Sequence, residues 1–350
     1  NIINSNQSIH LDKITIKDNI ISQEDLIDNA GKAIAYHIIE SIRDPFNSSF
    51  LCIAGIGNNG MDAIISNKYL IENNVDSQLL IVDPTVFDKD ILDSTSYFTP
   101  LDNLTFSNYK YIVDGVFGTG LKREIAGIFY STLEEMEKHD SVISIDIPSG
   151  IFVDSGNASN ISITAVQTIT FTYPKIGHYI SKGYKASGEL FIYPIGHSPD
   201  RISSSVYLIQ DEDISKLIKP INSVSDKYSN GKVLSLSGSI NYTGAALLSG
   251  ISTLKAGAGI LKQIFPLSLK QSFSQLKEAI DFPIDDKGLG YLTSSAETQI
   301  SLSYDWPDCF LLGPGISKNA ESIDLMIIVL SNYKGSCVID ATGLSAINFK

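Results

Sequence analysis

The stretch Gly55-Ile-Gly-Asn-Asn-Gly60-Met-Asp62 decides the fold. It directly follows a short apolar run at residues 50–54 and leads into a helical pattern at residues 62–70. A buried strand, a glycine turn and a helix in this order are typical of a parallel α/β sheet, where glycines let the backbone approach a phosphate. The spacing differs from the GxGxxG pattern with a distal acidic residue, so an ordinary NAD-dependent dehydrogenase is poorly supported.

Strand and helix patterns alternate outward from this turn. Ser22 lies three residues before Asp25 and predicts the start of a helix. Apolar runs predict strands at residues 78–82, 111–117, 142–147, 166–173 and 190–195, with a helix at 128–139. This alternation predicts a mainly parallel sheet with helices on both faces, which is a Rossmann-like three-layer α/β arrangement.

A polar, proline-containing segment follows at residues 197–232, with a short helix expected at 212–218. A second α/β pattern then begins with a strand at 233–236, a turn at Gly238-Ser239 and a helix at 245–254. Residues 310–312 and 337–339 are expected to form two further strands. We therefore expect two domains, residues 1–212 and residues 213–350, of which the second is short for its pattern.

The composition excludes several classes of protein. Apolar residues make up 43% of the 350 residues and charged residues 19%, as in globular chains. The net charge of −13 argues against nucleic acid as a partner, because a duplex binder needs a basic face. No apolar run is long enough to cross a bilayer, and the start lacks a signal-peptide pattern. Cys52, Cys309 and Cys337 form no CxxC pair, so we expect a cytoplasmic protein that binds neither nucleic acid nor membrane.

Polar loops also follow two other expected strands. One loop begins at Asp114 and contains Gly118 and Gly120, and the other runs from Asp146 to Ser149. Because the carboxyl ends of parallel strands meet at one edge of the sheet, both carboxylates would lie beside the glycine turn in one cleft. Such a cleft can bind a cation or move protons.

The histidines are isolated in sequence, and no pair has metal-ligand spacing, so we assign them no chemistry. Tyr173, Lys175 and His178 lie near a strand end and are candidates for the border of the cleft, although we prefer a structural role for them.

The segment Asp25-Leu-Ile-Asp-Asn29-Ala-Gly31 resembles the Leu-Met-Glu-Asn-Ala-Gly helix of the YjeF-type N-terminal domains, the NAD(P)H-hydrate epimerases. The three loops described above follow in that family's order. The resemblance continues through Phe171-Thr-Tyr-Pro-Lys175-Ile-Gly177 and covers most of residues 10–197.

The second pattern resembles the ADP- or ATP-dependent NAD(P)H-hydrate dehydratases, a ribokinase-like α/β fold that follows the epimerase in bifunctional proteins. The motifs concerned are Gly238-Ser239, Tyr242-Thr-Gly-Ala245-Ala246, Leu254-Lys-Ala-Gly-Ala-Gly259, Gly313-Pro-Gly315 and Asp340-Ala341. The later elements of that family, including its catalytic aspartate, lie beyond Lys350. We therefore expect a truncated dehydratase domain that does not catalyse its reaction without those elements.

The resemblance implies an enzyme of nicotinamide nucleotide repair. Its substrate would be NADH or NADPH that carries water at carbon 6 of the reduced ring, in an R or an S configuration. The first domain would interconvert the two forms as an isomerase. The second, when complete, would dehydrate the S form as a lyase that uses ADP or ATP with Mg²⁺. We also expect a homo-oligomer.

The resemblance further assigns site residues. Positions that contact the substrate are Asn58, Asn59, Gly60, Met61, Asp62, Gly118, Thr119, Gly120, Leu121, Lys122, Arg123, Glu124, Asp146, Ala245 and Gly315. A potassium ion would be held by Asn59, Asp114 and Ser149, whose amide, carboxylate and hydroxyl oxygens are suitable hard ligands. Asp114 and Asp146 are both candidates for the catalytic acid or base, and we prefer Asp146.

Some positions depart from the family pattern. Met61 and Ala63 stand where the family has glycine, and Met61 would cost about 1 kcal/mol if it needed a positive φ. These two replacements would be compatible with a loss of catalysis. The alternative function is therefore a non-catalytic YjeF-type binding or scaffold module. The enzyme's residue types at Asn59, Asp114 and Asp146 favour the catalytic interpretation.

Overall fold

The computed structural model describes residues 1–18, 20–100, 104–198, 201–218 and 224–347. The chain divides into two compact units, Asn1–Ile214 and Ser215–Lys350. Within the described residues, no helix is both long and apolar enough to span a bilayer.

The first unit contains a six-stranded sheet in which all strands run parallel, in the order β2-β1-β3-β4-β5-β6. The strands are β1 (Ser49–Ala54), β2 (Asp76–Ile81), β3 (Tyr111–Gly115), β4 (Val142–Ile145), β5 (Gln167–Phe171) and β6 (Glu189–Tyr193). The strand order reverses at β1, which has β2 on one side and β3 on the other. In open parallel sheets, ligands bind beyond the carboxyl ends of the strands at such a switch point.

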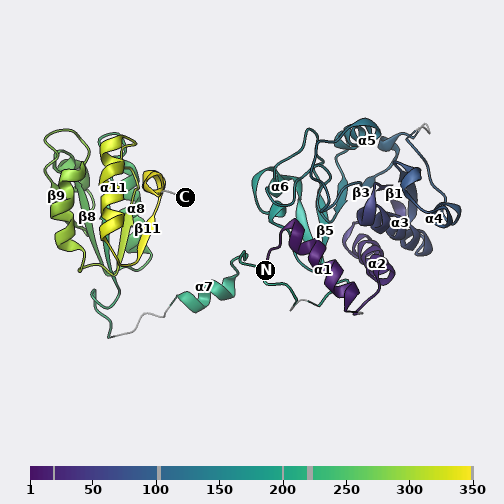
Figure 1. The fold of residues 1–350 in the computed structure, drawn as a ribbon, viewed down its shortest axis with the longest axis horizontal. Coiled ribbons are helices and arrows are strands. Elements are labelled where there is room, and N and C mark those ends of the chain that lie inside the picture. The colour runs from purple at the N-terminus through teal and green to yellow at the C-terminus, as the bar shows by residue number, and fades with distance from the viewer. Residues whose placement is uncertain (19, 101–103, 199–200, 219–223, 348–350) are drawn as a thin grey trace. The chain divides into compact units, whose positions relative to one another are not determined.

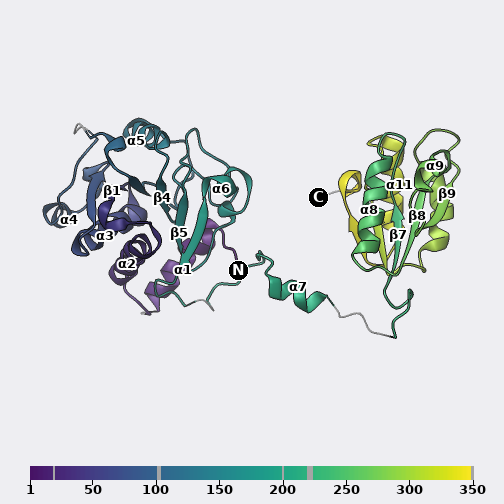
Figure 2. The ribbon, with the colours of Figure 1, turned by 180° about the vertical axis from the view of Figure 1, so that it is seen from behind.

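Helices cover both faces of this sheet. The helices of the first unit are α1 (Ser5–Lys17), α2 (Gln23–Ser41), α3 (Gly57–Glu72), α4 (Lys89–Asp93), α5 (Gly127–Glu137) and α6 (Ser181–Ala186). Helix α7 (Asp211–Leu217) has no buried residue and includes the division between the two units. Helices α2 and α3 pack side by side (Figures 1 and 2).

The alternation of side chains along β1 separates two cores. Phe50 packs with Ile38 of α2 on one face, whereas Leu51 packs with Leu133 of α5 on the other. The predicted three-layer arrangement is therefore confirmed for this unit.

Several features of the first unit differ from the sequence-based expectations, among them the short helices α4 and α6, which were not predicted. Helix α1 was not predicted, although Asn4 and Gln7 form a capping box at its start. Helix α3 begins at Gly57 rather than at Asp62, so Asn58 and Asn59 lie in its first turn. The predicted start at Ser22 is confirmed, because the Ser22 side chain accepts a hydrogen bond from the Asp25 amide and caps α2.

The second unit contains a five-stranded parallel sheet in the order β11-β10-β7-β8-β9. Its strands are β7 (Lys232–Leu236), β8 (Ile260–Pro266), β9 (Ile280–Ile284), β10 (Cys309–Leu312) and β11 (Cys337–Ile339). Its helices are α8 (Thr243–Lys255), α9 (Lys270–Phe273), α10 (Glu297–Ile300) and α11 (Ala320–Asn332). The sequence did not predict β8, β9 or α11, but the α/β class is confirmed.

The sheet of the second unit is also covered on both faces. Phe310 packs with Met326 of α11, whereas Phe265 packs with Ala246 of α8. Helix α11 accordingly lies in front of the sheet in Figure 1, and α8 lies in front in Figure 2, the view from behind.

The glycine turn after β1 packs tightly against itself. A Cβ atom at Gly60 would lie 2.2 Å from the Gly55 carbonyl oxygen. We expect Gly60→Ala to destabilise the first unit by about 1–3 kcal/mol, because the backbone must shift to relieve the overlap. Urea unfolding measures this. Gly120→Ala is the control, since a Cβ there meets nothing within 4 Å, and equal losses in the two variants would contradict the prediction.

Candidate functional site

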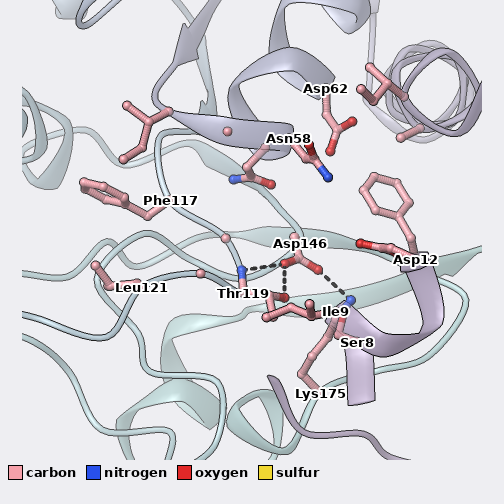
Figure 3. A pocket seen from close by; sticks show the side chains of 18 of the residues that line it. Ser8, Ile9, Asp12, Asn58, Asp62, Phe117, Thr119, Leu121, Asp146 and Lys175 are labelled. Atoms are coloured by element: carbon pink, nitrogen blue, oxygen red, sulfur yellow. Dashed lines mark hydrogen bonds and ion pairs between the residues drawn. The ribbon is translucent and has the colours of Figure 1, made fainter. Parts of the chain in front are cut away.

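A cavity of about 970 Å³ opens at the carboxyl ends of the strands of the first sheet, where the strand order reverses. We call it the switch-point pocket. The start of α3, the loop after β3, Asp146 after β4 and Lys175 after β5 contribute to its wall, and α1 and α2 close it. Its volume is at the upper end of the range for small-molecule sites. Figure 3 shows these side chains converging on one space.

Most of the residues assigned to the substrate in the first domain line this pocket. They are Asn58, Asn59, Asp62, Gly118, Thr119, Gly120, Leu121, Lys122, Arg123, Glu124 and Asp146. Gly60 and Met61 are not among the lining residues. Gly60 faces the Gly55 carbonyl, and Met61 packs on the core beside α2. Met61 and Ala63 both lie within α3 and neither has a positive φ, so the backbone strain considered above does not arise.

Asp146 occupies a strained turn at the end of β4. Its φ is +66°, and the Ile147 amide donates to the Ile145 carbonyl at 2.8 Å, which closes a γ-turn around it. A γ-turn of this hand is rare for a residue with a side chain and concentrates at functional sites. The turn aims the carboxylate at the loop after β3, where Oδ2 accepts from the Thr119 amide at 3.0 Å and from its hydroxyl at 2.7 Å.

Asp146 also forms a buried ion pair. The Lys175 ammonium lies 2.5 Å from Asp146 Oδ1, and the two residues are only 2% and 9% exposed. The ammonium also donates to Thr170 Oγ1 at 2.6 Å. Burial alone would raise the pKa of Asp146, but the charge and hydrogen bond of Lys175, together with Thr119, hold that pKa at about 2. Asp146 is therefore a carboxylate at neutral pH.

His178 connects the backbones of the two ion-pair residues. Its Nε2 donates to the Asp146 carbonyl at 2.8 Å, and its Nδ1 accepts from the Lys175 amide at 3.0 Å. These partners require a neutral ring with its proton on Nε2. Burial and the nearby Lys175 charge lower the pKa of His178 to about 4, in agreement with that state. A structural role was the preferred expectation for Lys175 and His178, whereas Lys175 lies in the pocket wall, which was the alternative expectation.

A second carboxyl, that of Asp62, lies in the same pocket, and its pKa is shifted in the opposite direction from that of Asp146. Burial raises its pKa well above the usual range, and the charges of Asp146 and Asp12 raise it further. The Lys175 ammonium lowers it, but by less. In Figure 3, Asp62 enters the pocket from α3 and Asp146 from the loop after β4.

Two polar lining residues, Asp12 and His197, were not predicted from the sequence. Asp12 lies on α1, which was not predicted, and His197 is isolated in sequence and was assigned no chemistry. Asp12 of α1 lines the pocket and pairs with His197, whose Nε2 lies 3.0 Å from the Asp12 carboxylate. The other ring nitrogen of His197 lies 2.8 Å from the hydroxyl of Thr172, which has a φ of +59°. The capping pattern at Asn4 and Gln7 was the available signal for α1.

Asp114 lies beneath the pocket rather than in its wall. Its carboxylate is fully buried and accepts from the Ser149 hydroxyl at 2.5 Å, the Ser149 amide at 2.9 Å and the Ser144 hydroxyl at 2.9 Å. Burial outweighs these hydrogen bonds and raises the pKa of Asp114. The nearby amide nitrogen of Asn59 is buried without a partner among the described residues. Of the two acid-base candidates, only Asp146 reaches the pocket.

Two family models match the chain. One is described as YjeF-related protein N-terminus and covers residues 23–177, and the other is described as NAD(P)H-hydrate dehydratase and covers residues 233–350. A protein named NAD(P)H-hydrate epimerase from Oenococcus oeni is 31% identical, over 55% of this chain and 96% of that protein. The chain belongs to the NAD(P)H-hydrate repair family.

Other members of the NAD(P)H-hydrate repair family match both units. The bifunctional NAD(P)H-hydrate repair enzyme Nnr of Dictyoglomus turgidum is 29% identical over 92% of this chain and 66% of that protein. The protein of the same name from Thermofilum pendens is 27% identical over 93% of this chain and 65% of that protein. The chain thus spans just under two thirds of the length of these relatives.

A crystal structure of yeast ynu0 is 21% identical, covers 64% of this chain and 97% of that chain, and has a TM-score of 0.47. The two family models confirm the resemblance that the sequence motifs indicated.

In the second unit, which matches the dehydratase model of the NAD(P)H-hydrate repair family, loops also meet where the strand order reverses. The Gly238 amide donates to the Pro314 carbonyl at 2.8 Å, and the Ser239 hydroxyl donates to the Gly315 carbonyl at 2.7 Å. A Cβ atom at Gly315 would lie 3.3 Å from that of Ala245. The structure therefore brings together Ala245 and Gly315, the two positions assigned to the substrate in this unit.

The Lys175 ion pair generates a stability prediction. Because Asp146 has a lowered pKa, it contributes stability above its ordinary pKa near 4, and this contribution is lost as the pH falls toward 2. In Lys175→Met the carboxylate is buried without a cation, so its pKa rises and it destabilises the fold at neutral pH. We expect a loss of about 3–5 kcal/mol at pH 7 that shrinks toward pH 4, measured by urea unfolding.

Lys32→Met is the matched control. Lys32 pairs with Asp28 at 2.7 Å, but both side chains are more than one third exposed and screened by solvent, so the loss of this pair should change stability far less than the loss of Lys175. A similar loss in both variants, or no pH dependence in Lys175→Met, would contradict the assigned charge states.

Proposed function

We propose that residues 1–212 form an NAD(P)H-hydrate epimerase domain that interconverts the R and S hydrates of NADH and NADPH. One observation carries the proposal: the switch-point pocket holds two carboxyl groups whose surroundings shift their pKa values in opposite directions. They lie next to a helix start that is suited to a dinucleotide. The hydrate is a hemiaminal, with a hydroxyl group on a carbon bonded to nitrogen. Its inversion requires a proton to be added and another removed, which paired acid and base side chains provide.

The wall of the pocket also suits the phosphates of a dinucleotide. Ile56, the N-cap residue of α3, has no polar side chain that could cap the helix. The first-turn amide groups of Asn58 and Asn59 therefore donate no hydrogen bond to an N-cap side chain. A helix N-terminus with available amides attracts phosphate oxygens. Lys122 and Arg123 line the facing loop and supply positive charge in a chain that is acidic as a whole.

We propose that Asp146 is the catalytic base. It is ionised at neutral pH, lines the pocket and is held in place by Thr119 and Lys175. Asp114 is the less suitable candidate, because its hydrogen bonds lie within the core and it does not reach the pocket.

We propose that Asn59, Asp114 and Ser149 hold a potassium ion. The residues fit such an ion, since the Ser149 hydroxyl oxygen lies 2.5 Å from an Asp114 oxygen and 3.3 Å from the Phe117 carbonyl oxygen. The side-chain nitrogen of Asn59 has no partner among the described residues, and exchanging the positions of the amide nitrogen and oxygen would present the oxygen, the atom that can bind a cation. A bound cation would offset the buried charge of Asp114 and tie together the ends of β3 and β4.

For the second unit, we propose a partial NAD(P)H-hydrate dehydratase domain over residues 213–350, with Ala245 and Gly315 beside the hydrate. The complete protein would use ADP or ATP with Mg²⁺ to dehydrate the S form. A homo-oligomer is the expected assembly, and light scattering of the purified chain tests it. No structural observation favours the scaffold alternative, because Met61 and Ala63 leave the pocket wall intact.

The epimerase proposal predicts faster interconversion of separated hydrate epimers in the presence of the protein, followed by chromatography. Asp146→Asn should lower kcat by about 10²–10⁴-fold, because the base is lost. Circular dichroism should verify that this variant is folded. A wild-type rate equal to the spontaneous rate would rule out the proposed activity, and full activity in Asp146→Asn would rule out its assignment as the base.

The cation proposal predicts a different response in two neighbouring serine variants. Potassium chloride should raise the thermal midpoint of the wild-type first unit above that in tetramethylammonium chloride, because the ion binds the folded state only. Ser149→Ala removes one ligand and should abolish this difference. Ser144→Ala is the control, since Ser144 donates to the same Asp114 carboxylate but is no proposed ligand. Equal responses in the two variants would refute the ligand set.

A further inference from the structure

We propose that Asp62 is the catalytic acid that works opposite Asp146, so that the hydrate is inverted between two carboxyl groups that approach from different elements of the pocket. This inference rests on the proposed epimerase function. Asp62 extends from the second turn of α3, which follows β1, whereas Asp146 extends from the γ-turn after β4 (Figure 3). Both line the pocket, with Asn58 and the loop after β3 nearby.

The two carboxyl groups differ in what surrounds them. Asp146 is bound by the amide and hydroxyl of Thr119, by the hydroxyl of Thr170 at 3.3 Å and by the Lys175 ammonium. Within the described part of the chain, the Asp62 side chain has no hydrogen bond or ion pair, although the residue is only 7% exposed. The Lys175 ammonium in this pocket wall thus forms its ion pair with Asp146.

A buried carboxyl without a cation is most stable when protonated, because the charged form loses its hydration without compensation. The charged groups that act on Asp62 are Asp146 after β4, Asp12 on α1 and Lys175 after β5. Burial and the two aspartates raise the pKa of Asp62, and Lys175 offsets this only in part. Two titratable groups whose environments push their pKa values apart form an acid and base pair.

The chemistry balances with water alone. The Asp62 carboxyl donates its proton to the hydroxyl at carbon 6, the carbon–oxygen bond breaks, and water leaves. The lone pair of the ring nitrogen forms a double bond to carbon 6 and gives an iminium ion. A water molecule then forms a new carbon–oxygen bond on the opposite face and releases its proton to Asp146. The cycle leaves Asp62 ionised and Asp146 protonated.

The same pair also works in reverse. Inversion of the other epimer uses protonated Asp146 as acid and ionised Asp62 as base, which restores the starting state. A proton exchanged with solvent restores it as well. Lys175 promotes this second route, because it favours the ionised form of Asp146 and thereby releases the proton to solvent.

Asp62→Asn tests the assignment with little change of charge, because a neutral amide replaces a neutral acid. We expect kcat to fall by about 10²–10⁴-fold with KM little changed. The decrease of wild-type kcat/KM at high pH, where Asp62 ionises, should disappear from the residual activity. Asp12→Asn should move that decrease to lower pH, since it removes a negative charge that raises the pKa of Asp62. A full rate in Asp62→Asn, or an unchanged high-pH limb, would overturn the proposal.

Stability provides a readout that is independent of turnover. Above the ordinary aspartate range the unfolded chain ionises Asp62 while the folded chain keeps it protonated, so wild-type stability decreases as the pH rises. The Asp62→Asn midpoint should therefore exceed the wild-type midpoint by a margin that grows as the pH rises above the ordinary aspartate range. A margin that is absent or falls with pH would show that Asp62 is ionised in the fold, and would overturn the proposal.

Oxygen labelling tests the bond that breaks. In ¹⁸O-labelled water, each inversion by the wild-type protein should place one solvent oxygen at carbon 6, because the incoming water differs from the one that leaves. Retention of the original oxygen would show that the ring opens at the carbon–nitrogen bond, and would overturn the assigned step. If the wild-type protein does not accelerate inversion at all, the epimerase function fails. If it does and Asp62→Asn matches it, only this inference fails.

Discussion

The arrangement of the pocket depends on the buried ion pair between Asp146 and Lys175. Buried ion pairs lose hydration and are a weak source of stability compared with apolar packing. Their retention in a cleft therefore points to chemistry rather than to the fold. Here the pair separates the pKa values of two pocket carboxyls, because the Lys175 ammonium lies against Asp146, whereas Asp62 forms no ion pair with the described residues.

The parallel sheet makes this pair possible. β4 and β5 are neighbours, so their carboxyl ends bring Asp146 and the segment with Lys175 to the same edge. Both strands end in a γ-turn with a positive φ at its centre, at Asp146 and at Thr172. Each turn is bound by a buried imidazole, from His178 and His197 respectively. Histidines that looked unremarkable in the sequence thus hold strained backbone in place beside the cavity.

The sequence predicted the features that depend on local order along the chain. The glycine turn at Gly55 and the loops at Asp114 and Asp146 follow strands of one parallel sheet, so their meeting at one edge could be inferred from topology alone. The partners of those loops could not, because they depend on packing between distant segments. Asp12 reaches the pocket from a polar helix without a clear apolar stripe, and Met61 faces the core because α3 starts earlier than its pattern indicated.

Helix α1 has a consequence for the order in which the first unit can assemble. Its start is bound to Asp154 through the amide and hydroxyl of Ser5, and its middle is bound to His197 through Asp12. The chain just before it pairs with Val206. One wall of the cavity is therefore made of residues near the start of the unit and is secured by some of the last residues of the unit. The sheet can form earlier, but the binding site is closed only when both ends of the unit have met.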